Sequence, residues 1–147
     1  MKTIIFVCHG NICRSVAAEF IAKQYVKKHH LNNEFKIYSR ATSLEEIGND
    51  IYPPMKEALR KYNISFERHN TQRISKEDYD EADLIFYMDE ENHYYLNKMF
   101  IDSKNKIKPI TIYSQKLNEI SDPWYNGKYE EVVEQLICCI NVIFKNL

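Results

Sequence analysis

A short segment near the start of the chain carries side chains that could do chemistry together. It reads Cys8-His9-Gly10-Asn11-Ile12-Cys13-Arg14-Ser15. A cysteine thiolate is a strong nucleophile, and the planar guanidinium of an arginine can donate to two phosphate oxygens at once. Gly10 and Asn11 tolerate the backbone angles of a tightly curled loop. The segment therefore predicts an attacking thiolate beside a site for a tetrahedral oxyanion.

The residues on either side predict the elements that would position this loop. Residues 3–7 form an unbroken apolar run, typical of a strand that is buried on both faces at the centre of a covered sheet. In residues 15–28 apolar side chains recur every three or four positions, which predicts an amphipathic helix. The loop would then join the carboxyl end of a strand to the N-terminus of a helix. Ligands bind at that place in α/β sheets, and the helix N-terminus attracts anions.

Two further residues could assist the thiolate. Ser15 could donate its hydroxyl to the sulfur of Cys8, or it could only cap the helix. Asp122 follows the last predicted strand at the same edge of the sheet, in a loop that Pro123 would stiffen. A carboxylic acid there could protonate the leaving oxygen of a phosphate ester. Asp-Pro is also a common turn sequence, so an ordinary turn is the competing interpretation.

The rest of the chain alternates between strand and helix patterns. Further strands are predicted at residues 35–39, 84–88 and 107–113, and further helices at 54–62, from Ser75, at about 90–100 and at the C-terminal end. Pro109 favours an edge position for the last strand. Such alternation implies parallel strands joined by crossovers. We expect one α/β domain, residues 1–147, with a small doubly wound four-stranded parallel sheet, helices on both faces and the phosphate loop after the first strand.

The composition narrows the function. Of the 147 residues 44% are hydrophobic and 28% are charged, and 20 basic against 21 acidic residues give a net charge of -1. A general nucleic-acid binder carries an excess of basic residues, so nucleic acid is not an expected partner. No apolar run approaches the roughly 20 residues that cross a bilayer, and no signal peptide is recognisable. We expect a cytoplasmic monomer with no membrane partner.

The four cysteines are predicted to be reduced. They lie at 8, 13, 138 and 139, without the spacing of a zinc site or of a secreted disulfide framework. A loop that turns its N–H groups inward cannot also arrange Cys8, His9 and Cys13 around a metal, so no metal or other cofactor is expected. Cys13 either packs beneath the loop or forms a reversible disulfide with Cys8. Periodicity assigns Cys139 to the core and Cys138 to the polar face of the last helix.

Two motifs make the chain similar to a known family. The first is a cysteine followed by five residues, an arginine and a serine, and the second is Asp122-Pro123-Trp124-Tyr125. In order and separation they resemble the motifs of the low-molecular-weight protein tyrosine phosphatases. The similarity continues through residues 75–80, 84–92 and the last helix, so it covers essentially the whole chain.

The resemblance implies an enzyme that hydrolyses phosphotyrosine in proteins, and small aryl phosphates, through a cysteinyl-phosphate intermediate without a cofactor. By this resemblance Cys8 is the nucleophile, Arg14 binds the phosphoryl group in the ground and transition states, and Asp122 is first the general acid and then the general base.

The resemblance also assigns roles around these three residues. Positions that brace the phosphate loop are matched by Asn11, Ser15, Ser39 and His69. The rim and walls of the substrate slot are matched by His9, Trp124 and Tyr125. Glu45 and Glu46 stand where the opposite wall often has an aromatic residue. A deep aromatic slot favours phosphotyrosine over the shorter phosphoserine.

Two other functions remain open from the sequence. A thioredoxin-coupled arsenate reductase shares the fold and the loop but needs two more cysteines to relay a disulfide, and here the only others are adjacent in the last helix. A phosphate-binding module without catalysis would need only the loop. The presence of Cys8, Arg14 and Asp122 together favours an enzyme.

Overall fold

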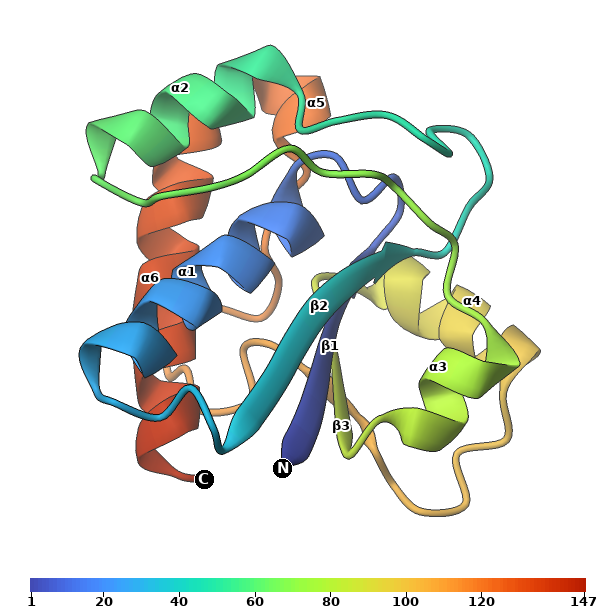
Figure 1. Ribbon diagram of the computed structural model, residues 1–147. Helices are drawn as coiled ribbons and strands as arrows, with labels where there is room; N and C mark the ends of the chain where they lie inside the picture. Colours follow the sequence, from blue (N-terminus) through green and yellow to red (C-terminus); the bar gives the residue numbers. More distant parts are fainter.

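The chain folds around a four-stranded parallel sheet (Figure 1). A computed structural model describes all of residues 1–147. The strands are β1 (Lys2–Cys8), β2 (Phe35–Ala41), β3 (Leu84–Tyr87) and β4 (Ile107–Pro109). They pair in the order β2-β1-β3-β4, and every pair is parallel. The chain passes from β1 to β2 on one side and then crosses to β3 on the other side of β1. The carboxyl end of β1 is therefore the switch point at which ligands bind in such sheets.

Helices cover both faces of the sheet, and the doubly wound fold predicted from the sequence is confirmed. α1 (Arg14–Lys28), α2 (Pro53–Lys61) and α6 (Tyr129–Lys145) lie on one side, and α3 (Lys76–Glu81) and α4 (Glu90–Met99) lie on the other (Figure 1). α5 (Pro123–Asn126) is a single turn close to the start of α2.

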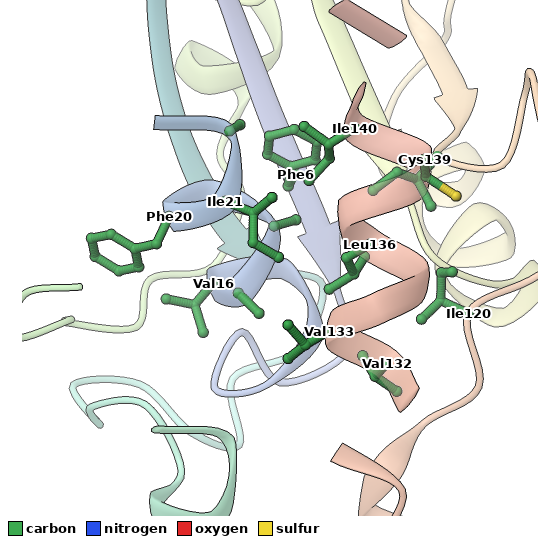
Figure 2. Close-up of a cluster of buried hydrophobic side chains, with 14 of the residues drawn as sticks. Phe6, Val16, Phe20, Ile21, Ile120, Val132, Val133, Leu136, Cys139 and Ile140 are labelled. Atoms are coloured by element: carbon green, nitrogen blue, oxygen red, sulfur yellow. The ribbon is translucent and has the colours of Figure 1, made fainter. Parts of the chain in front are cut away.

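The central strand divides the core between the two faces. Ile4 and Phe6 belong to a cluster of 29 buried residues that α1, α2 and α6 complete, whereas Ile5 and Val7 belong to a cluster of nine beneath α3 and α4. In Figure 2 side chains of α1 and α6 face each other beside Phe6. All four strand residues are fully buried, which explains why the apolar run shows no polar alternation.

The fourth strand is shorter than predicted. Its pairing ends at Pro109, not at residue 113. The N–H of Ile110 still donates to the carbonyl of Tyr87 (2.9 Å), but the chain then turns, and the N–H of Ile112 donates back to the carbonyl of Pro109 (3.0 Å). Since β4 has a neighbour on one side only, nothing holds these residues extended. The edge position that Pro109 predicted is confirmed.

The last helix packs largely as its periodicity predicted. Cys139 is buried and Cys138 is exposed, as expected. Val132 is buried in the core, whereas Leu147 lies beyond the end of α6 and is 43% exposed. Neither α6 nor any other helix combines the length and apolarity needed to cross a membrane.

Candidate active site

The loop between β1 and α1 lines a pocket of about 410 Å³ at the carboxyl edge of the sheet. The other lining residues are Glu45 and Glu46 after β2, Asp89 and Glu91 at the start of α4, and Asp122, Trp124 and Tyr125 in and before α5. The structure thus brings together the predicted nucleophile, guanidinium, acid and aromatic side chains. Ser15, Ser39 and His69 do not line this pocket and instead support the loop from within the fold.

The backbone of the loop offers unpaired N–H groups. The carbonyl of His9 accepts from the N–H and hydroxyl of Ser43 (3.2 and 2.9 Å), and that of Ile12 accepts from the N–H of Tyr52 (2.9 Å). The N–H groups of residues 9, 10 and 12–14 donate to no group of the protein. A series of free N–H groups at a helix N-terminus is a site for an anion.

Only one of the two residues expected to adopt left-handed angles does so. Asn11 has a φ of 59°, whereas Gly10 has no positive φ. A Cβ at Gly10 would lie 3.6 Å from Cγ of Glu46, an ordinary packing distance. The curl of the loop therefore depends on Asn11, whose short polar side chain tolerates this conformation.

The sulfur of Cys8 is surrounded by hydrogen-bond donors. Cys8 is 3% exposed. Its Sγ accepts from the N–H groups of Asn11 (3.3 Å) and Ser15 (3.4 Å), and Oγ of Ser15 lies 3.0 Å away. No side chain caps the N-terminus of α1, so Ser15 contacts the sulfur and does not act as the cap. The sulfur is thus contacted by two backbone donors and one hydroxyl group.

The side chain of Asn11 fixes the direction of the hydroxyl of Ser15. Asn11 is fully buried, and its Nδ2 donates to Oγ of Ser15 (2.7 Å) and Oγ of Ser39 (2.9 Å). Because each hydroxyl accepts from the amide, its own hydrogen points elsewhere. Ser39 donates to Oε1 of Glu19 (2.6 Å). Ser15 is left to donate to the sulfur of Cys8.

His69 holds the other end of the same amide. Its Nε2 lies 2.8 Å from the backbone carbonyl of Asn11 and 3.0 Å from Oδ1 of that residue. Both atoms are acceptors, so Nε2 carries the hydrogen. Burial lowers the pKa of His69 below its usual 6.5, although the charge of Glu19 and the bond to Asn11 oppose this shift. A neutral imidazole therefore anchors the loop.

We expect the Asn11→Ala variant to lose about 3–5 kcal/mol of unfolding free energy. The buried hydroxyls of Ser15 and Ser39 lose the amide donor, His69 keeps only the backbone carbonyl as its acceptor, and alanine is placed at a left-handed position. Denaturant unfolding measures this loss. The matched control is Asn63→Ala. Asn63 has a similar φ of 58°, but it is exposed and its side chain makes no hydrogen bond; only its backbone carbonyl accepts, from Gln24. The control should lose only the backbone contribution of about 1–2 kcal/mol. Equal losses would show that the side-chain network of Asn11 contributes nothing.

Arg14 presents one edge of its guanidinium to the pocket. It is 2% exposed, and its Nη1 donates to Oδ2 of Asp89 (2.6 Å) and to the carbonyl of Ile120 (2.8 Å). Its Nε and Nη2 make no hydrogen bond within the protein, and Nη2 lies 3.6 Å from Oδ2 of Asp122. Burial lowers the pKa of Arg14, but the negative charges of Cys8 and Asp89 together raise it by more, so the pKa lies above its usual value. A permanent cation thus keeps two donors for phosphate oxygens.

Asp122 caps a helix that the sequence did not predict. Its Oδ1 accepts from the N–H of Trp124 (3.0 Å), and Pro123 begins the single turn of α5, which Gly127 ends at a φ of 70°. The capping hydrogen bond and the restricted backbone of Pro123 hold the carboxyl group of Asp122 at the pocket. Its side chain is 28% exposed. Asp122 is therefore both a turn residue and a pocket residue.

The aromatic residues border the pocket mouth but do not close it. Trp124 rests against Tyr52 with ring centroids 5.0 Å apart. Trp124 is 55% exposed and Tyr125 is 86% exposed. His9 also lines the pocket, and its Nε2 forms a hydrogen bond with Oε2 of Glu45 (2.8 Å). The slot is thus open to solvent on its aromatic side.

Cys13 differs from Cys8 in its surroundings. It is 6% exposed, and burial followed by the charge of Cys8 raises the pKa of its thiol. All four cysteines are free, and Cys138 and Cys139 do not line the pocket. No three histidine, cysteine or carboxylate side chains are placed to hold a metal ion.

Three residues of the site have roles that the residue pattern alone does not indicate; of these, the family resemblance points to Asp89, with an ordinary surface or capping residue as the alternative. Asp89 binds Arg14, Glu19 accepts from Ser39, and Thr71 donates to the carbonyl of Asn11 (3.1 Å). A signal existed for Asp89, because it directly follows a predicted strand and must lie at the same edge of the sheet as Cys8. Glu19 and Thr71 have no comparable local signal.

The chain is similar to a family of known function. A profile described as low molecular weight phosphotyrosine protein phosphatase matches residues 3–147. The mouse protein of that name is 36% identical over 144 residues, which cover 94% of this chain and 90% of that protein. The low molecular weight protein-tyrosine-phosphatase YfkJ of Bacillus subtilis is 35% identical over 137 residues, which cover 91% of this chain and 88% of that protein.

Solved structures agree with the sequence similarity. The crystal structure of YfkJ superposes with a TM-score of 0.94 at 32% identity, over 99% of this chain and 94% of that chain. A low molecular weight protein tyrosine phosphatase from Streptococcus pyogenes gives a TM-score of 0.87 at 32% identity, over 100% of this chain and 93% of that chain.

Proposed function

The chain belongs to the low molecular weight phosphotyrosine protein phosphatase family, and from this premise we propose that its pocket hydrolyses phosphotyrosine through a cysteinyl-phosphate intermediate. Membership makes the chain a protein tyrosine phosphatase, a hydrolase of phosphate monoesters. The observation that carries the mechanism is the set of donors around the sulfur of Cys8 at the carboxyl end of β1. A thiolate held there lies beside unpaired N–H groups that suit a phosphoryl group.

In the first step the thiolate of Cys8 attacks the phosphorus, and the bond from phosphorus to the tyrosyl oxygen breaks. The unpaired N–H groups of residues 9, 10 and 12–14 and the free edge of Arg14 hold the non-bridging oxygens. These donors are fixed before the reaction, so they stabilise charge in the transition state without reorganising. Asp122, in its protonated form, gives its proton to the leaving oxygen, and tyrosine departs neutral.

In the second step the phosphocysteine is hydrolysed. The carboxylate of Asp122 accepts a proton from water while the water oxygen attacks the phosphorus. The bond from sulfur to phosphorus breaks, and its electron pair returns to Cys8. The hydroxyl of Ser15, directed at the sulfur by Asn11, stabilises the departing thiolate. Release of phosphate restores the starting state.

The preference for an aryl phosphate rests on the aromatic border of the pocket. Trp124 is braced by Tyr52 and, with Tyr125, offers flat apolar surface to a phenyl ring. The phosphoryl group must reach the loop at the inner end of the pocket, which a tyrosine side chain can do more readily than a serine side chain. The names of the relatives point to the same substrate class.

Phosphate release from p-nitrophenyl phosphate and from a phosphotyrosine peptide, measured in EDTA, tests this proposal. We expect both to be hydrolysed without added metal, and a matched phosphoserine peptide to be hydrolysed far more slowly. A protein that binds phosphate but releases none from either aryl substrate would be a binding module and would overturn the proposal.

A further inference from the structure

Most of the charged side chains that line the pocket are negative, although the pocket should receive a phosphate dianion. Five carboxylates line it, Asp89, Asp122, Glu45, Glu46 and Glu91, against a single guanidinium, that of Arg14. No lysine lines it. Asp89 and Asp122 lie within 3.6 Å of that guanidinium and so belong to the phosphoryl site itself. The carboxylates of Glu45, Glu46 and Glu91 do not contact Arg14.

Glu45, Glu46 and Glu91 border the pocket without a cationic partner of fixed charge. None of the ion pairs of the molecule joins them to lysine or arginine. Glu45 and Glu91 approach opposite nitrogens of His9, at 2.8 and 3.5 Å, and are 69% and 63% exposed. Glu46 accepts from the side chain of Asn49 and lies against Gly10.

These glutamates come from two separate elements that meet beside the loop. Glu45 and Glu46 follow β2, and Glu91 lies in the first turn of α4. In Figure 1 both segments border the upper end of β1, from which the loop begins. A peptide whose phosphorylated side chain enters the pocket must pass close to them. The carboxylates thus lie where the residues flanking that side chain would be.

The electrostatic consequence differs for the two parts of a substrate. The phosphoryl group is bound at short range by N–H groups and Arg14, which act after it has entered. The flanking residues meet exposed carboxylates, which attract positive and repel negative side chains over a Debye length of about 10 Å at 0.1 M salt. Discrimination can arise from repulsion of the wrong substrate as much as from attraction of the right one.

We propose that this acidic border selects phosphotyrosine segments that carry lysine or arginine beside the phosphotyrosine, and disfavours segments that carry aspartate or glutamate there. The inference rests on the proposed phosphatase function and specifies the substrate class of the same pocket. Glu45 and Glu91 are its main determinants, since they are exposed and come from both sides of His9.

The test uses three phosphotyrosine peptides that differ only in having lysine, alanine or aspartate at the flanking positions. For each protein, kcat/KM for a peptide is divided by kcat/KM for p-nitrophenyl phosphate, so that general changes in catalysis cancel. An exposed charge pair contributes up to roughly fivefold. We therefore expect the parent to prefer the lysine peptide over the aspartate peptide by about tenfold at low salt, with the alanine peptide between them.

The variant Glu45→Gln/Glu91→Gln is expected to reduce that preference at least about threefold. The matched control Glu34→Gln/Glu57→Gln removes the same net charge from exposed positions outside the pocket and should keep the preference. Raising the salt to about 0.5 M should weaken the preference of the parent.

Equal use of the lysine and aspartate peptides by the parent, or equal preferences in the two double variants, would overturn the inference. Hydrolysis of p-nitrophenyl phosphate without hydrolysis of any peptide would overturn it as well. Failure to hydrolyse even p-nitrophenyl phosphate would instead refute the proposed phosphatase function.

Discussion

Replacing Cys8 with serine is expected to reduce the turnover of p-nitrophenyl phosphate by at least about 10⁴-fold, because a serine hydroxyl in the same place remains protonated and is a far weaker nucleophile than a thiolate. The substitution is nearly isosteric, and the N–H groups and the edge of Arg14 that we propose bind phosphate make no hydrogen bond to the sulfur. Binding of inorganic phosphate should therefore persist while turnover is lost. Steady-state kinetics and calorimetric titration with phosphate measure the two quantities separately.

Cys13→Ser is the matched control for this prediction. Cys13 lies in the same loop and is similarly buried, but its sulfur makes no hydrogen bond, and burial raises the pKa of its thiol. We expect this variant to lose far less activity than Cys8→Ser. In single-turnover experiments quenched with acid, the parent and the Cys13 variant should carry a phosphoryl group, and the Cys8 variant should not. A phosphoryl group retained after loss of Cys8 would contradict the assignment of the nucleophile.

The parts of the site that sequence could predict are those encoded by adjacent residues. The structure of the segment from β1 through the loop into α1 can be predicted from its residues. A strand buried on both faces is an unbroken apolar run, and a helix repeats its apolar residues every three or four positions. The helix predicted to begin from Ser75 is another case, since Ser75 and Asp78 form a reciprocal pair of hydrogen bonds at the start of α3.

The parts that could not be predicted depend on distant segments. Periodicity places Glu19 on the polar side of α1, yet it is 6% exposed because the neighbouring strand supplies the hydroxyl of Ser39 as a partner. A buried carboxylate is tolerated only when it is hydrogen-bonded or paired, and Lys23 contributes a second contact at 2.6 Å. Lys23 is a local partner four residues along the same helix, but Ser39 comes from β2 and cannot be inferred from the residues adjacent to Glu19. The family resemblance supplied Ser39 and His69, but not the route by which they act on Asn11.

The strand expected at 107–113 shows a different limit. A β-branched run such as Ile110-Thr111-Ile112 has the same residue pattern in a strand and in a turn. The difference is decided by whether a neighbouring strand continues beside it, and β3 ends at Tyr87. The turn begins the segment that leads to Asp122, so the early end of the strand affects how the proposed general acid is placed.

Asp122→Asn is expected to lower the rate constant of the first chemical step by about 10²–10⁴-fold for phenyl phosphate, whose leaving oxygen needs a proton, and by much less for p-nitrophenyl phosphate, because nitrophenolate leaves as a stable anion. Asparagine is as good a helix cap as aspartate, so it can still accept from the N–H of Trp124 and keep α5 in place. The variant therefore removes the proton donor with little change in structure. Circular dichroism and thermal unfolding check that the fold is retained.

The leaving group provides the internal control for Asp122. In the parent, kcat should be similar for the two substrates, since a protonated leaving oxygen makes both depart readily and the shared phosphocysteine then limits the rate. In the variant, rapid-quench measurement of phenol and nitrophenol release should show a wide separation in the first step. The second step should be slowed equally for both, because the same phosphocysteine awaits a water that no base activates. A first-step loss of equal size for both substrates would contradict proton donation by Asp122 and would assign its effect to the charge that it places 3.6 Å from Arg14.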